Sequence, residues 1–527
     1  METQTALYPL WMLAGPLAYG ALALLSVFYP GSRKPPMLRA ARISTWIALA
    51  ASVLGAVFVL RHGSLETPLA GLEGLGLSLR LDALSALMLV MIALLALVIM
   101  RYSATYLDGD PRQGAFLGRL GATIAAVQCL VMSGNLALFF VAWVATGWSL
   151  QRLLCFYAER PAARIAGRKK WIVSRLGELS LLGAFAMLYQ ATGTGQLRML
   201  IERLAEPNLI AAQAGWLVPA ALLLVLAALL QSAQFPTHGW LIEVMETPTP
   251  VSALLHAGIL NAGPFLMVRF AALMETAPAA QALLIVAGGF TALFASTALL
   301  PQPAVKNALG YSSAAHMGFM LMVCGLGLYP AVMLHLVAHS FYKAHAFLAS
   351  GSVIDTLRAE RLALPRRTGH PARVLASLFA ALAIYLGLAW LWGVRPDEHP
   401  GLLGVGAILV LGLAQIIAPA LDSEGPVRAA LRASGMALGV GMAFFSLESG
   451  AHYLLQSVLP PLSTMEPLRV ALMAGVLIAF AGVVFLQIVG PALPPHRRLR
   501  RLAIHLRHGL YANAWFDRLT DAYRTTS

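Results

Sequence analysis

The stretch MLHLVAHSFYKAHAFLASGSVI (333–354) sets a row of ionisable side chains into an otherwise apolar segment. His335, His339 and Lys343 follow one another at intervals of four residues, which places them on one stripe of an α-helix. At about 1.5 Å of rise per residue, the stripe is roughly 12 Å long. Ionisable groups are costly inside a bilayer and are usually functional there. We therefore expect this row to carry exchangeable protons through a membrane.

The rest of the chain is strongly apolar. Of its 527 residues, 59% are hydrophobic and only 11% are charged, and the mean hydropathy is +0.74. A soluble protein of this length could not cover so much apolar surface with polar groups. The sequence therefore predicts an all-α polytopic membrane protein that contacts the lipid bilayer and no nucleic acid.

Runs of about 20 apolar residues recur along the chain, and each is long enough for one membrane crossing. We predict about fifteen transmembrane helices. The expected spans are 6–29, 43–60, 82–100, 119–133, 135–157, 171–191, 216–232, 249–270, 280–300, 304–325, 328–350, 372–393, 401–419, 430–448 and 468–490. Residues 1–490 are expected to form a single transmembrane domain.

The net charge of +14 comes from four basic clusters. They are Arg33, Lys34, Arg39 and Arg42; Arg160, Arg164, Arg168, Lys169 and Lys170; Arg358, Arg361, Arg366, Arg367 and Arg373; and the tail from Arg497 to Arg507. An outside N-terminus brings all four to the cytoplasmic face, where basic loops meet anionic lipid. The C-terminus is then inside.

Residues 491–527 are predicted to form a cytoplasmic, basic amphipathic tail. Tyr511, Trp515, Phe516 and Tyr523 occur there at roughly helical spacing, on the membrane surface or against a partner. The three cysteines all fall in or beside apolar segments, without zinc or iron–sulfur spacing. No metal site and no cofactor are predicted.

Several spans carry breaks. Gln231-Ser232-Ala233-Gln234-Phe235-Pro236 ends an apolar run, and Pro248, Pro250 and Pro264 follow in and around the next one. Broken helices at membrane depth are tolerated where the freed backbone faces protein or a water-filled cavity, and they often mark ion sites. The alternative is a proline kink that serves packing alone.

Other ionisable residues are candidates, each with a structural alternative. Glu178 could pair with a lysine of a neighbouring helix, or lie at the interface paired with Arg175. His256 could be a core histidine bonded to a hydroxyl, and Asp82 could simply cap a helix. The predicted proton or cation path comprises Lys306, His335, His339, Lys343, His256 and Glu178. Secondary candidates are Asp82, Gln231, Glu243 and Glu246, of which the last two are expected to be solvated.

Three stretches resemble the proton-translocating, antiporter-like subunits of respiratory complex I and of Mrp cation/proton antiporters. They are QSAQFPTHGWLIEVMETPTPVSALLHAGILNAG (231–263), AVKNALGYSSAAHMGFM (304–320) and HLVAHSFYKAHAFLASGSVI (335–354). Shorter likenesses occur at RLDALSALML (80–89) and RLGELSLL (175–182). The resemblance implies about fourteen core helices, with two inverted five-helix repeats and a broken helix in each. The antiporter-like core would span about residues 75–420.

The resemblance also implies site residues. Lys306, His335, His339 and Lys343 match the family's central hydrophilic chain. His256 matches a histidine beside the broken helix, and Glu178 matches an acidic position near the lysine site.

Two family positions differ here. The family has a Glu directly after the tryptophan of its fifth helix, where this chain has Trp143-Val144. It has a Lys before Ser-Ala-Gln in the broken helix, where this chain has Gln231. The acidic or basic residue expected at the second broken helix, near 365–420, also has no clear counterpart.

A divergent branch fits these departures. HAGILNAGPFLMVRF (256–270), the chain length and the short basic-aromatic tail resemble the membrane subunit of DAB-type inorganic carbon accumulation systems. That resemblance implies a large zinc-binding partner similar to a β-carbonic anhydrase. It also implies a non-enzymatic subunit of the bacterial inner membrane that conducts H⁺ or Na⁺ to drive CO2 or bicarbonate accumulation.

Two other functions compete with this one. The chain could be a proton-translocating subunit of a respiratory NADH-quinone oxidoreductase, a hydrogenase or an Mrp-type antiporter complex. It could also be a structural membrane anchor, in which case Lys343→Ala and His339→Ala leave activity intact.

Overall fold

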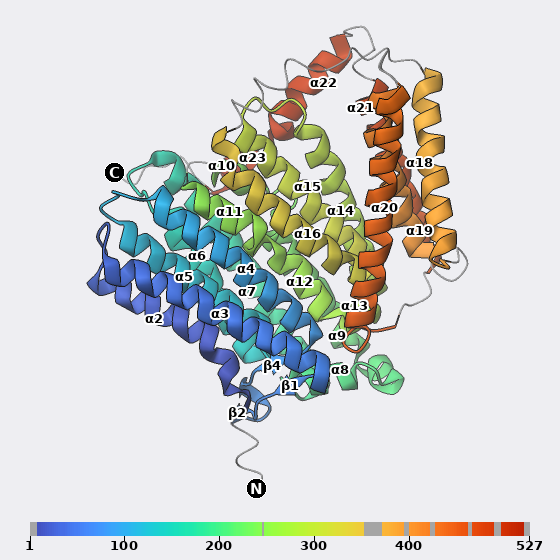
Figure 1. The fold of residues 1–527 in the computed structure, drawn as a ribbon. Helices are drawn as coiled ribbons and strands as arrows, with labels where there is room; N and C mark the ends of the chain where they lie inside the picture. Colours follow the sequence, from blue (N-terminus) through green and yellow to red (C-terminus); the bar gives the residue numbers. More distant parts are fainter. Residues whose placement is uncertain are drawn as a thin grey trace.

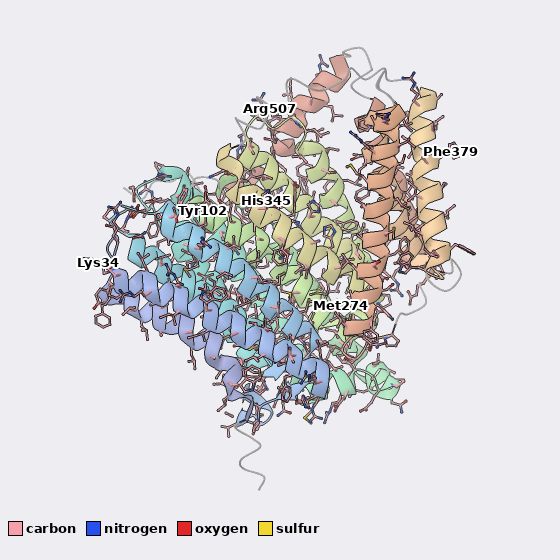
Figure 2. The ribbon with its side chains drawn as sticks, viewed as in Figure 1. Lys34, Tyr102, Met274, His345, Phe379 and Arg507 are labelled. Carbon is pink, nitrogen blue, oxygen red and sulfur yellow. The ribbon has the colours of Figure 1, made fainter. Side chains whose placement is uncertain are left out.

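The chain folds into a bundle of long helices in the computed structural model, which describes residues 8–244, 247–352, 371–394, 400–421, 427–461, 466–489 and 497–520 (Figure 1). Within these residues, 12 helices are long and apolar enough to cross a membrane. The predicted all-α polytopic architecture is confirmed. Apolar side chains such as Phe379, which is 68% exposed, cover the outside of the bundle (Figure 2).

The described helices form three consecutive groups along the chain. The first group is η1 (Tyr8–Leu13), α2 (Ala14–Phe28), α3 (Pro35–His62), α4 (Ala83–Tyr106), α5 (Gln113–Val131), α6 (Leu136–Leu154) and α7 (Pro161–Thr192). The second is α8 (Leu197–Arg203), α9 (Pro207–Gln231), α10 (Gly239–Glu243), α11 (Thr249–Ala257), η3 (Ile259–Asn261), α12 (Ala262–Arg269), α13 (Ala271–Glu275), α14 (Pro278–Ala298), α15 (Val305–Gly325), α16 (Tyr329–Leu348) and η4 (Ser350–Ser352). The third is α18 (Pro371–Leu391), α19 (Pro400–Leu421), α20 (Val427–Leu455), α21 (Pro467–Val489), α22 (Arg497–Arg507), η6 (Gly509–Tyr511) and α23 (Ala512–Thr520).

Small residues let the central helices approach closely. A Cβ on Gly288 of α14 would lie 2.6 Å from the carbonyl oxygen of Gly318 on α15. Such contacts favour glycine, because membrane helices gain stability from close van der Waals packing. Helix α14 and helix α15, which carries His316, are therefore held at a short separation.

Two small antiparallel strand pairs cover one end of the bundle. β1 (Leu65–Glu66) pairs with β4 (Arg80–Leu81), and β2 (Ala70–Leu72) pairs with β3 (Leu75–Leu77). They lie at the opposite end from α22 (Figure 1). The sequence did not predict them, because strands of two or three residues are too short to show an alternating pattern.

The crossing expected at 249–270 is not one continuous helix. It consists of α11, η3 and α12, and the interruption lies at Gly258–Asn261 rather than at Pro264. The short helix α10 fills part of the preceding connection. The prediction of broken helices in this region is confirmed, with the break placed one turn earlier in the chain.

The second basic cluster is only partly a loop. Because α7 begins at Pro161, ten residues before the predicted start, Lys169 and Lys170 lie within the helix and are 0% and 1% exposed. Their expected contact with anionic lipid is therefore wrong. The residues of the third cluster from 358 to 367 lie outside the described part of the chain.

Asp82 joins two distant helices as well as capping one. Its Oδ1 accepts a hydrogen bond from the backbone N–H of Ser85, which confirms the predicted cap of α4. Its Oδ2 also contacts Arg80 Nε at 2.9 Å and Arg269 Nη1 at 2.5 Å. Asp82 is 0% and Arg269 is 4% exposed. This buried ion network ties α4 to the end of α12.

We expect Asp82→Asn to destabilise the fold, because it leaves two buried guanidinium groups without their shared carboxylate. Removing one partner of a buried ion pair typically costs about 3–5 kcal/mol. The thermal unfolding midpoint of the detergent-purified protein should fall clearly. The matched control is Asp108→Asn, whose carboxylate pairs with the exposed Arg33 and should leave the midpoint nearly unchanged. Equal midpoints for the two variants would contradict the structural role of Asp82.

Candidate functional site

The row predicted from the sequence lies on one face of α16, turned toward the protein interior. His339 is 3% and Lys343 is 0% exposed, and His335 is partly buried. The rings of His335 and His339 are nearly parallel, with centroids 6.2 Å apart. The shared stripe is therefore present, and it does not point into bulk solvent.

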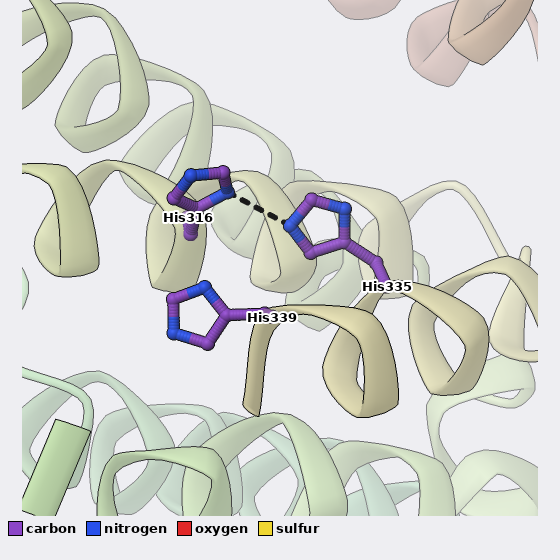
Figure 3. A group of neighbouring side chains, drawn as sticks. All are labelled: His316, His335 and His339. Atoms are coloured by element: carbon purple, nitrogen blue, oxygen red, sulfur yellow. Dashed lines mark hydrogen bonds between the residues drawn. The ribbon is translucent and has the colours of Figure 1, made fainter. Parts of the chain in front are cut away.

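A histidine from the neighbouring helix completes the row. His316 of α15 places its Nδ1 2.9 Å from His335 Nε2, and its ring centroid lies 4.9 Å from that of His339 (Figure 3). The sequence interpretation missed His316. Its only signal was a histidine within an apolar helix, and nothing in the spacing along α15 shows that it faces α16. Together the three imidazoles form the His316–His335–His339 cluster.

The cluster has the donors of a metal site but not the charge balance. One ligand atom from each ring lies within 4.8 Å of the others, whereas Zn–N bonds of about 2.0–2.1 Å in a tetrahedral site bring ligand atoms to about 3.3 Å from one another. The ammonium of Lys343 lies one turn beyond His339 and opposes a dication there. Imidazoles in contact are also suited to passing protons, because each ring can accept on one nitrogen and donate from the other.

Lys343 and Phe347, on which His256 stacks, follow His339 on α16. Lys343 Nζ donates to the carbonyl oxygen of Leu309 at 3.2 Å. His256 of α11 is 0% exposed and stacks on Phe347, with ring centroids 4.2 Å apart. Neither nitrogen of His256 has a hydrogen-bond partner within the described residues. The alternative of a core histidine bonded to a hydroxyl is therefore wrong.

Lys306 of α15 is more exposed than Lys343. It is the second residue of α15, and its Nζ donates to Thr249 Oγ1 of α11 at 3.3 Å. Its side chain is only partly buried. Lys306 is thus placed between the protein surface and the start of the broken segment.

A cavity borders the histidines on the side away from α11. It has a volume of about 530 Å³, and His316 and His335 form part of its wall. Its remaining lining comes mostly from apolar side chains of α14, α15, α16, α19, α20 and α21, such as Val405 and Phe444. The cavity brings open space next to the imidazole pair, and no acidic group of the described residues lies in its wall.

Glu178 belongs to a second polar region, on α7. It is 7% exposed, and its Oε1 accepts from Arg175 Nη2 at 2.5 Å. The pair with Arg175 is confirmed, whereas the expected pair with a lysine of a neighbouring helix is not formed within the described residues. The carboxylate also faces α6, because a Cβ on Gly147 would lie 3.4 Å from Glu178 Oε1.

Gln231 connects this second region to the break between α9 and α12. Its Oε1 accepts from Lys170 Nζ at 3.0 Å. The next residue, Ser232, donates from Oγ to the carbonyl oxygen of Leu260 at 3.1 Å. Small polar groups therefore connect α7 with the break before α12.

The line of polar groups continues to α16. Asn261, the last residue of η3, donates from Nδ2 to Ser340 Oγ at 2.8 Å. Ser340 follows His339 and lies one turn before Lys343. The ionisable row and the α7 region are thus bridged by buried amide, hydroxyl and backbone groups, which we call the polar thread: Lys170, Gln231, Ser232, Asn261, Ser340 and Lys343.

The secondary candidate Glu243 differs from its predicted role. Glu243 is not solvated: its carboxylate contacts Lys169 Nζ at 2.6 and 2.7 Å and accepts from Asn513 Nδ2 at 2.6 Å. Lys169 also pairs with Asp517, so α23 is anchored to α7 and α10. Glu246 lies outside the described residues. Asp82 belongs to the structural network of α4 and α12.

Comparison with known families agrees with this arrangement. The family described as NADH:quinone oxidoreductase/Mrp antiporter, TM matches residues 133–387. The N-terminal family of complex I chain 5 matches residues 72–117. The chain is also similar in fold to a chain of the Mrp complex from Dietzia sp., with a TM-score of 0.65 and 23% identity, covering 98% of this chain and 60% of that one. The fold is therefore that of an antiporter-like membrane subunit.

Proteins of similar sequence show which group of antiporter-like subunits the chain belongs to. A probable inorganic carbon transporter subunit, DabB2 of Halothiobacillus neapolitanus, is 39% identical over 85% of this chain and 81% of its own length. A probable inorganic carbon transporter subunit, DabB of Hydrogenovibrio crunogenus, is 38% identical over 62% of this chain and 63% of its own length. The chain belongs to the DabB family of antiporter-like membrane subunits.

We expect Lys169→Met to release α23, because Glu243 and Asp517 lose the cation that they share. Limited trypsin digestion of the detergent-purified protein should then cleave faster after Arg518 on α23, as measured by mass spectrometry of the released peptides. Arg168→Met is the matched control, since Arg168 is the preceding residue and is exposed. Equal rates of cleavage after Arg518 in both variants would show that the ion pairs do not hold α23.

Proposed function

We propose that this chain is the ion-conducting membrane subunit of an inorganic carbon pump. It conducts H⁺, or Na⁺, across the inner membrane of a bacterium and drives a large zinc-containing partner similar to a carbonic anhydrase. The relatives that are named as probable inorganic carbon transporter subunits support the carbon substrate. The hydration of CO2 takes place on the partner, and this chain supplies the energy.

The observation that carries the proposal is the row His316–His335–His339–Lys343, in which His339 and Lys343 are buried and the other two are partly buried. Charged or titratable groups at such depth are expensive unless they serve a path. A proton that arrives on one nitrogen of His335 can leave from the other, and the 2.9 Å contact with His316 is short enough for a direct transfer. Lys343 then accepts or releases the proton, because a buried amine readily changes its protonation state.

Lys306, His256 and Glu178 have supporting roles in this path. Lys306 exchanges protons between the surface and the start of α11, where its Nζ contacts Thr249. His256 stacks on Phe347, one turn beyond Lys343 on α16, and a charge on its ring would oppose the charge of Lys343. Glu178 sets the field at the α7 end of the polar thread.

Protonation of Lys343 changes the charge inside the bundle, and we propose that this change is transmitted to the partner. The cytoplasmic face would be the one that carries α22 and α23, with the N-terminus outside. The basic tail 491–527 would then meet the partner or anionic lipid.

The partner is identified by what co-purifies with the tagged chain in a mild detergent. A large protein with stoichiometric zinc supports the carbon pump. Quinone-oxidoreductase subunits would instead favour a respiratory complex, the alternative suggested by the family matched at residues 133–387. Growth of a carbonic-anhydrase-deficient cell in ambient air, when both subunits are produced, is the functional readout.

We expect Lys343→Met to stop this growth rescue and to lower ion uptake into proteoliposomes about tenfold or more, because the acceptor at the end of the row is lost. His339→Gln should have a similar effect. The matched control is His345→Gln, which lies on the same helix but is exposed (Figure 2) and should retain uptake. Normal uptake by Lys343→Met would refute the proposed path and favour a structural anchor.

A further inference from the structure

Two adjacent lysines of α7 are buried in different ways. Lys169 Nζ is surrounded by carboxylates, since it pairs with both Glu243 and Asp517. Lys170 Nζ has neutral partners: it donates to Ser174 Oγ at 2.7 Å and to Gln231 Oε1 at 3.0 Å. The same ammonium lies 4.9 Å from the centroid of the Trp240 ring.

These surroundings separate a structural lysine from an exchangeable one. If Lys169 lost its proton, two carboxylates would be left without their shared cation, which is strongly unfavourable in a buried site. If Lys170 lost its proton, a neutral amine would remain among a hydroxyl, an amide and an aromatic ring. Neither its charged nor its neutral form leaves an opposite charge behind, so Lys170 is free to change protonation state.

Lys170 lies at the α7 end of the polar thread, where a change of its protonation state could serve ion conduction. Its partner Gln231 ends α9 at the break, and Ser232, Asn261 and Ser340 continue the polar thread to Lys343. Glu178 lies eight residues further along α7, about 12 Å away along the helix axis. Lys170 thus stands between the carboxylate of α7 and the row on α16.

Lys170 also accounts for the missing charge at residue 231. The broken segment carries a neutral Gln231 at the position where related subunits are expected to have a lysine. In this chain, an ammonium occupies the space beside Gln231 Oε1, but its side chain comes from α7.

We propose that Lys170 is the proton-carrying residue of the α7 half of the path, and that Gln231 positions its ammonium. This inference rests on the proposed ion conduction and adds a residue to it. Protons reach Lys170 from the side of Glu178 and leave it toward Lys343, in a direction kept polar by the hydroxyls of Ser232 and Ser340 and the amide of Asn261. The two halves of the path are then both lysine-based, with Lys170 on α7 and Lys343 on α16.

An exchange of the two side chains tests the proposal. Ion uptake is measured in proteoliposomes that contain the full chain with its partner subunit, for Lys170→Met, Lys170→Arg and the double variant Lys170→Gln/Gln231→Lys. We expect both single variants to lose uptake about tenfold or more, since methionine carries no proton and the arginine guanidinium does not release one. The double variant should recover much of the lost rate, because it returns an exchangeable amine to the same place.

Arg168→Met is the matched control for a change of charge on the same helix turn and should retain uptake. Each variant is first checked for a single gel-filtration peak and a thermal midpoint close to that of the unaltered protein. Lys170→Arg keeps the positive charge, so a folded Lys170→Arg protein with normal uptake would show that Lys170 is only structural. Normal uptake by Lys170→Met, or no recovery in a folded double variant, would also overturn the inference.

Lys343→Met, assayed beside these variants, separates the two proposals. If Lys343→Met abolishes uptake and Lys170→Met does not, the inference about Lys170 fails while the conducting function stands. If Lys343→Met has no effect, the proposed function itself fails.

Discussion

Ionisable side chains in a low-dielectric interior need partners, and the kind of partner decides what each side chain can do. Where a cation meets a carboxylate, as Arg269 meets Asp82, the pair is fixed because separation or neutralisation leaves a buried charge. Where a cation meets hydroxyl, amide or carbonyl oxygens, as Lys343 meets Leu309, no opposite charge holds the proton in place. The described part of the bundle uses both arrangements, and they occur in different places.

The ion pairs lie where elements must be joined. Asp82 and Arg269 connect α4 with α12, and Lys169 connects α7 and α10 with α23. The neutral arrangement follows the interior line from Lys170 to Lys343. This separation has a physical consequence: the groups that would exchange protons are not the ones on which the packing depends, so the charge inside the bundle can change without loosening the ends of the helices.

The helix interruptions make polar backbone and side-chain groups available to neighbouring helices. A transmembrane helix satisfies its own backbone groups and offers few of them to neighbours. The break between α11 and α12 frees the carbonyl of Leu260 and brings Asn261 to Ser340, so polar groups cross a region that is otherwise apolar. The glycines at the α14–α15 contact hold α15, which carries His316, close to α14.

Much of this architecture follows from sequence periodicity, and the remainder depends on how the helices pack. The apolar runs predict the crossings, and the four-residue spacing on α16 predicts the shared face of His335, His339 and Lys343, because both are local properties of one segment. The partnership of His316 with His335 is a contact between two helices, and no pattern along either helix encodes it.

Lys169 and Lys170 were assigned to a basic loop because sequence composition shows a charge run but does not show where a helix begins. Because α7 begins at Pro161, both lysines belong to the helix, and both are buried. Neighbouring residues of an α-helix point about 100° apart, so Lys169 contacts carboxylates whereas Lys170 contacts Gln231. A charge count along the chain treats these two lysines as equivalent, whereas their partners make one an anchor and the other a candidate carrier.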